Sequence, residues 1–144
     1  MSLMLVWGVS NPEGVQNEQS IYLTKADIKD MVKQIDEASV AGKHIPVKVE
    51  HKGISVGKVV SAWEHKGELQ CILQLDSKTL EGDFGREFVK QGITPDLSMG
   101  YEVSLKHSQN SSISVQKKWL KEISIVKRGA RHNCHILGIS KDCQ

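Results

Sequence analysis

The chain has 144 residues, the usual size of one domain, and we expect residues 1–144 to form a single domain around one core. Its 19 lysines and arginines nearly balance 17 aspartates and glutamates, so bulk charge does not indicate nucleic acid or an anionic membrane as the partner. The sequence contains no apolar run near the roughly 20 residues that cross a bilayer, and no secretory signal pattern, so we expect a soluble intracellular protein.

The first part of the chain predicts a buried strand followed by an amphipathic helix. Residues 3–9 are almost wholly apolar and β-prone, which is typical of a buried strand. Met4 is a second candidate start, with residues 1–3 as an addition ahead of it. Thr24 can cap a helix that ends at Gly42, because apolar side chains recur between them at spacings of three and four. These side chains are Ile28, Met31, Val32, Ile35 and Ala38.

The middle of the chain predicts three short strands and a second helix. Residues 45–49, 56–63 and 69–75 are β-branched or alternate between apolar and polar, which favours antiparallel strands, and a turn at residues 65–67 joins the last two. Apolar residues spaced by four then predict a short helix over residues 79–91, although two glycines inside it weaken that prediction.

The last part of the chain predicts three further strands. Residues 97–105 alternate between apolar and small or polar side chains, which indicates a half-buried strand that carries Ser98 near its start. Residues 107–114 are polar and serine-rich and predict a solvated hairpin loop. Residues 119–126 and 135–139 predict the remaining strands.

These elements predict a mainly β protein of the α+β class. Six or seven short strands with two helices favour a closed or nearly closed antiparallel β-barrel, with the helices packed outside it.

Three residues in this order along the chain suit hydrolysis by a serine nucleophile: His51, Ser98 and Glu122. A serine hydroxyl is a weak nucleophile at neutral pH, so it needs a base within hydrogen-bond reach and a third group that orients the base. His51 closes a strand and opens a glycine-containing turn, where an imidazole with an ordinary pKa of about 6.5 can face a cleft.

The surroundings of the serine and the glutamate fit these roles. Ser98 enters its strand from a turn that contains Pro95, and Gly100 leaves open space on the same strand face. Glu122 shares a strand face with Ser124, where a carboxylate could stabilise an imidazolium ion. His135 is the rival candidate for this third position.

Three sequence blocks resemble those of phage prohead proteases, the capsid maturation serine proteases. They are His51 with Gly57 downstream, the run Leu97-Ser98-Met99-Gly100-Tyr101, and the run Lys121-Glu122-Ile123-Ser124-Ile125-Val126. The blocks cover residues 51–131, and the second and third runs are the specific parts. The herpesvirus assemblin proteases look related, although they have histidine where Glu122 stands.

The resemblance implies a herpesvirus-protease-like fold and a serine endopeptidase with Ser98 as nucleophile, His51 as base and Glu122 as third member. It implies no cofactor. The implied substrates are scaffold and major capsid proteins inside an assembling procapsid in the host cytoplasm, together with the flanking segments of the enzyme itself. The herpesvirus relatives work as dimers, which implies a homodimer or higher oligomer.

The resemblance also indicates where the oxyanion would be stabilised. The herpesvirus group uses arginines shortly beyond the third member to hold a water or a backbone amide there, and Arg131, with Arg128 as the weaker match, falls in that stretch. Backbone amides near Met99 and Gly100, or in the loop from Arg128 to Arg131, are the other candidates.

The cysteines have simpler explanations than a metal centre or disulfides. Cys71, Cys134 and Cys143 are too few and too unevenly spaced for a disulfide framework, so we expect free thiols. His132 and His135 lie near two of them, but the segment lacks a Cys-x2-Cys pair, and we expect no metal site.

A different class of function remains open from the sequence. Under this alternative, the chain is a catalytically silent barrel that serves as a scaffold or binding module. Lys117, Lys118, Lys127, Arg128 and Arg131 could contact nucleic acid, but basic residues that flank strands are usually solvated, so we do not expect such a partner.

Overall fold

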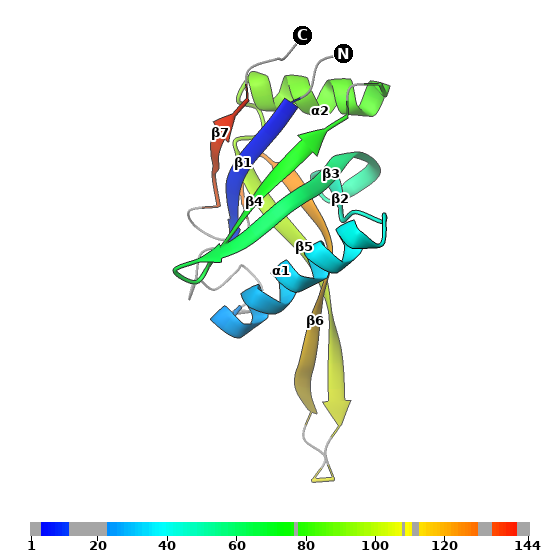
Figure 1. The fold of residues 1–144 in the computed structure, drawn as a ribbon, viewed down its shortest axis with the longest axis vertical. Helices are drawn as coiled ribbons and strands as arrows, with labels where there is room; N and C mark the ends of the chain where they lie inside the picture. Colours follow the sequence, from blue (N-terminus) through cyan, green and yellow to red (C-terminus); the bar gives the residue numbers. More distant parts are fainter. Residues whose placement is uncertain are drawn as a thin grey trace.

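The computed structural model describes residues 4–11, 23–76, 78–107, 109–110, 113–129 and 134–140. Within these ranges it contains seven strands and two helices (Figure 1). In chain order they are β1 (Met4–Asn11), α1 (Lys25–Val40), β2 (Pro46–Val49), β3 (Lys52–His65), β4 (Glu68–Leu75), α2 (Leu80–Lys90), β5 (Asp96–His107), β6 (Ile113–Val126) and β7 (Ile136–Ile139). Both predicted helices and the predicted strand number are confirmed.

The strands form one mixed sheet in the order β5-β6-β2-β3-β4-β1-β7. Five of its neighbouring pairs are antiparallel, but β2 and β6 run parallel, with Val47 opposite Ile123 and Val49 opposite Ile125. The prediction of a purely antiparallel sheet is therefore wrong. Short turns force hairpin neighbours to be antiparallel, whereas the long connection between β2 and β6 leaves their direction free.

The two edge strands of the sheet, β5 and β7, approach each other at one end. Asp96 and His135 form an isolated antiparallel bridge, and the Leu97 N–H donates to the Cys134 carbonyl at 2.9 Å. The described residues show no continuous ladder between β5 and β7. Closure of the sheet into a barrel thus stays a prediction.

Helix α1 begins at a complete capping box. The Thr24 hydroxyl accepts from the Asp27 N–H at 3.1 Å, and the Asp27 carboxylate accepts from the Thr24 N–H at 2.9 Å. The apolar side of α1, which includes Ile28, Met31 and Ile35, is buried in the core. Figure 1 shows the helix lying alongside the sheet. Within the described ranges, no helix has the length and apolar character needed to span a membrane.

The glycines that weakened the prediction of α2 allow this helix to pack closely. A Cβ at Gly82 would lie 2.5 Å from the Asp76 carbonyl oxygen, and one at Gly85 would lie 3.1 Å from the Val56 side chain. Helix α2 therefore covers its end of the sheet because these two positions have no side chain.

Strands β5 and β6 form a longer hairpin than predicted. β6 begins at Ile113 instead of residue 119, and β5 continues to His107, so both ends of the predicted loop, His107 and residues 113–114, belong to the two strands. Their outer halves extend beyond α1 as a two-stranded ribbon (Figure 1). The polar residues predicted a loop, but they can form strands because main-chain pairing in a hairpin needs no buried side chains.

The Gln34 side chain of α1 binds the backbone of β6 in the part of this strand that does not pair with β2. Its amide nitrogen donates to the Lys118 carbonyl at 2.9 Å, and its amide oxygen accepts from the Leu120 N–H at 2.8 Å. The β5–β6 register shifts directly after this point, between Leu120 and Glu122. Gln34 thus completes the hydrogen bonds of β6 beside an irregularity that precedes Glu122.

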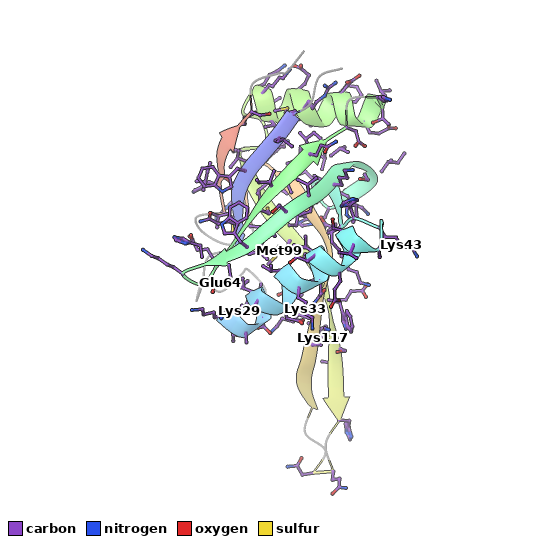
Figure 2. The ribbon with its side chains drawn as sticks, viewed as in Figure 1. Lys29, Lys33, Lys43, Glu64, Met99 and Lys117 are labelled. Carbon is purple, nitrogen blue, oxygen red and sulfur yellow. The ribbon has the colours of Figure 1, made fainter. Side chains whose placement is uncertain are left out.

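We expect Gln34→Ala to lower the free energy of unfolding by about 1–3 kcal/mol, because it leaves two backbone groups without their partner. Chemical denaturation would measure this loss. Lys33→Ala is the control on the exposed side of the same helix (Figure 2) and should change the stability by less than about 0.5 kcal/mol. Equal stabilities of the two variants would contradict this role of Gln34.

Candidate active site

His51 lies in a strained two-residue turn between β2 and β3. Val49 pairs with Lys52, and the two residues between them, Glu50 and His51, have positive φ angles of 52° and 61°. Positive φ at both central positions is the requirement of a type I′ turn, which favours asparagine and glycine. Non-glycine residues adopt this conformation at a cost of about 1–2 kcal/mol each, so tertiary contacts must hold the turn.

Strand β6 and the residue after it supply these contacts. The Glu50 N–H donates to the Ile125 carbonyl at 3.1 Å, and the His51 N–H donates to the Ser124 hydroxyl oxygen at 3.1 Å. The Glu50 carboxylate accepts from the Lys127 N–H at 2.6 Å. These bonds extend the parallel β2–β6 pairing into the turn and fix the position of His51.

The structure brings the three sequence-predicted residues together. His51 Nε2 lies 3.0 Å from Ser98 Oγ, and His51 Nδ1 lies 2.5 Å from Glu122 Oε1. Ser98 on β5 and Glu122 on β6 are 4% and 7% exposed, whereas the His51 side chain is 40% exposed. The imidazole therefore bridges two buried polar groups from its place at the protein surface.

The register of β5 and β6 places the polar groups on one face of the sheet. Ser98 lies opposite Ser124, and Gly100 lies opposite Glu122. A Cβ at Gly100 would lie 1.9 Å from Glu122 Oε1, so the glutamate carboxylate fills the space that the sequence suggested was open. Glycine is needed at position 100 because the carboxylate crosses β5 there to reach His51.

The pKa of His51 lies above its ordinary value. The hydrogen bond to Glu122 is the largest cause of this rise, burial opposes it, and the negative charges of Glu122 and Glu50 add to it. Glu122 thus stabilises the protonated imidazole, which is the form that exists after the imidazole has accepted a proton.

His135, the rival third member, lies in a different contact. Its Nδ1 is 2.8 Å from Asp96 Oδ1, and the other oxygen of Asp96 accepts from the Gly129 N–H at 2.9 Å. Asp96 therefore connects the segment after β6 to the start of β7. In this geometry Glu122, and not His135, is the partner of His51 Nδ1.

The candidate oxyanion groups fall into three classes. The Met99 side chain lies in the core (Figure 2), so only its backbone could take part. Arg128 is exposed after β6, and Arg131 lies outside the described residues. The N–H groups of Lys127 and Gly129 already donate to carboxylates, so they are not preformed oxyanion donors.

Neither described cysteine resembles a nucleophile. Cys71 is a free thiol, as predicted, and burial raises its pKa to about 12, which keeps it neutral. Cys134 is also buried. The Cys134 thiol donates to the Ser10 carbonyl at 3.4 Å. Cys143 and His132 lie outside the described residues.

A shallow apolar groove of about 200 Å³ adjoins the His51 turn. Val49 and Lys52, the residues that flank the turn, line this groove. The exposed side chains of Ile54 and Phe84 also line it. Such a surface can accept an apolar side chain of a polypeptide.

Ser124 is a site residue that the sequence reasoning did not assign. Its hydroxyl accepts from the His51 N–H at 3.1 Å and donates to Glu122 Oε2 at 2.5 Å. The available signal was its position two residues after Glu122, which places both on the same face of a strand.

The fold is that of viral capsid-assembly and herpesvirus proteases. The bacteriophage T4 capsid assembly protease gp21 superposes with a TM-score of 0.62 at 13% identity, covering 86% of this chain and 96% of that protein. The protease of Kaposi's sarcoma-associated herpesvirus, in complex with a hexapeptide phosphonate inhibitor, superposes with a TM-score of 0.59 at 16% identity. This match covers 99% of the chain but only 66% of the herpesvirus protein, slightly less than two thirds.

Comparison by sequence gives no such match. No protein-family model matches the chain, and the search of curated proteins found no match to its sequence. The likeness therefore lies in the three-dimensional arrangement of the elements.

We expect Gly100→Ala to separate Glu122 from His51, because the added methyl group would occupy the position of Glu122 Oε1. The pKa of His51, measured by NMR titration, should then fall toward its ordinary value. Gly138→Ala is the control, since its Cβ would make an ordinary 3.4 Å contact with Trp7. An unchanged His51 titration in Gly100→Ala would show that the carboxylate does not need this space.

Proposed function

We propose that this protein is a serine endopeptidase with Ser98 as nucleophile, His51 as general base and Glu122 as the group that orients the base. The observation that carries the proposal is the continuous contact from Ser98 Oγ to His51 Nε2 at 3.0 Å and from His51 Nδ1 to Glu122 Oε1 at 2.5 Å. A hydroxyl, an imidazole and a carboxylate in this order are the requirement for hydrolysis through an acyl-enzyme.

In the acylation step, Ser98 Oγ attacks the scissile carbonyl carbon while its proton passes to His51 Nε2. The Glu122 carboxylate accepts a hydrogen bond from the His51 Nδ1–H group and stabilises the resulting imidazolium ion. His51 then gives the Nε2 proton to the leaving amine as the peptide C–N bond breaks. Arg128 or Arg131, or a backbone amide near Met99 and Gly100, would stabilise the oxyanion.

In the deacylation step, water attacks the acyl-enzyme. His51 Nε2 accepts a proton from the water, and the ester bond to Ser98 Oγ breaks. The proton returns to Ser98 Oγ, and a free carboxylate leaves. No step requires a cofactor.

The substrates we propose are scaffold and major capsid proteins of an assembling viral procapsid in the host cytoplasm, and the enzyme's own flanking segments. The fold shared with a capsid assembly protease supports this choice. The apolar groove that adjoins the turn at Val49 and Lys52 would accept a substrate side chain. A homodimer or higher oligomer stays a prediction.

Ser98→Ala should abolish reaction with an alkyl fluorophosphonate, which phosphonylates an activated serine with loss of fluoride and needs no known cleavage sequence. Mass spectrometry would locate the adduct on Ser98 in the parent protein. Ser104→Ala, on the same strand, is the control and should react normally. If the parent protein does not react at Ser98, the alternative of a catalytically silent scaffold or binding module is favoured.

Glu122→Gln should reduce the phosphonylation rate by about 10²–10⁴-fold. Only neutral His51 accepts the Ser98 proton, so the rate rises as the pH passes upward through the pKa of His51. That pKa is raised chiefly by Glu122, so the midpoint of the parent profile should lie above about 6.5 and should fall in the variant. The pH profile of the rate constant measures both effects.

The control for this change is Glu102→Gln, an exposed glutamate on β5 that pairs with Lys121. Its rate and midpoint should equal those of the parent protein. A Glu122→Gln variant with the parent rate would assign the orienting role to another group, such as His135.

A further inference from the structure

A single buried hydroxyl links the strained His51 turn to the carboxylate that contacts the His51 ring. Ser124 is 0% exposed and lies within β6, with Lys48 of β2 opposite it on one side and Ser98 of β5 on the other. Both neighbouring strands thus fix its backbone. Its side chain lies on the face of the sheet that carries Ser98 and Glu122.

The chemistry of the groups fixes the direction of both hydrogen bonds. A backbone N–H can only donate, so Ser124 Oγ must accept from the His51 N–H. The one hydroxyl proton is then available for Glu122 Oε2, at 2.5 Å. The other oxygen, Glu122 Oε1, faces His51 Nδ1. Backbone amide, hydroxyl, carboxylate and imidazole therefore form a closed ring of contacts that begins and ends at His51.

We propose that Ser124 is a positioning residue of this site: its hydroxyl sets both the backbone position of His51 and the orientation of the Glu122 carboxylate. This inference rests on the proposed function. The His51 N–H belongs to a residue at positive φ, which the surroundings must hold in place. The carboxylate could otherwise rotate about its last torsion angle, because such torsions are broad.

The two bonds act together because they share one oxygen atom. A side chain that fills the same space without a hydroxyl would leave the His51 N–H and Glu122 Oε2 without these partners. A side chain with a hydroxyl and one added methyl group would retain both bonds. Valine and threonine have almost the same shape and both favour strands, so they separate the hydroxyl from the volume.

The test compares Ser124→Thr, Ser124→Val and Ser124→Ala in the full chain, with thermal unfolding to confirm that each is folded. The first measurement is the rate of phosphonylation by the alkyl fluorophosphonate at saturating reagent. The second is the pKa of His51 by NMR titration without any reagent. The alanine variant adds no volume, so it keeps the test valid if the valine variant does not fold.

We expect the threonine variant to react within about threefold of the parent rate, and the valine and alanine variants to react about 10–100-fold more slowly. In the slow variants, the pKa of His51 should fall toward its ordinary value, because its largest cause is the bond to a correctly oriented Glu122. A purely structural role would lower the melting temperature without this change in titration.

Two results would overturn the inference. One is a parent-like rate and His51 titration in the alanine or valine variant. The other is a threonine variant as slow as the valine variant, which would assign the effect to volume. Failure of the proposed function is distinct: the parent protein would then not react at Ser98, and the His51 titration alone would decide the part of Ser124.

Discussion

The site depends on the parallel pairing of β2 with β6. This pairing ends at Val49 and Ile125, and the turn that follows β2 continues along β6 through backbone bonds to Ile125 and Ser124. The bonds offset the strain of two successive residues at positive φ. Without that neighbour, β2 and β3 would be a hairpin with an unfavourable turn, and His51 would have no fixed relation to β5 or β6.

The acidic partner of His51 is fixed by independent features of the fold. Gly100 leaves room for the Glu122 carboxylate to cross β5, and the Ser124 hydroxyl donates a hydrogen bond to its Oε2 atom. On the side of β6 that precedes Glu122, Gln34 of α1 binds the backbone next to the shift in register. Helix α1 thereby helps to set the position of the β6 backbone just before Glu122. Preorganisation of this kind holds a carboxylate in a fixed place beside an imidazole.

The fold shared with the T4 and herpesvirus proteases at 13–16% identity shows that few positions need a particular residue. Core positions accept many apolar side chains, provided that volume and pattern are kept. In this chain the demanding positions are those with one allowed geometry, such as Gly100, and those with two simultaneous bonds, such as Gln34 and Ser124.

The sequence by itself determined the two helices and the approximate positions of the strands, because periodicity, capping and glycine positions are local properties of the chain. Thr24 specified the start of α1, and the alternation after residue 97 specified β5. The resemblance to protease blocks added His51, Ser98 and Glu122 as a set. Only the tertiary structure decided the parallel β2–β6 pairing, the use of the space beside Gly100 and the part of Ser124. These features join residues that are distant in sequence, and no local pattern specifies which strand lies beside another or which hydroxyl meets which carboxylate.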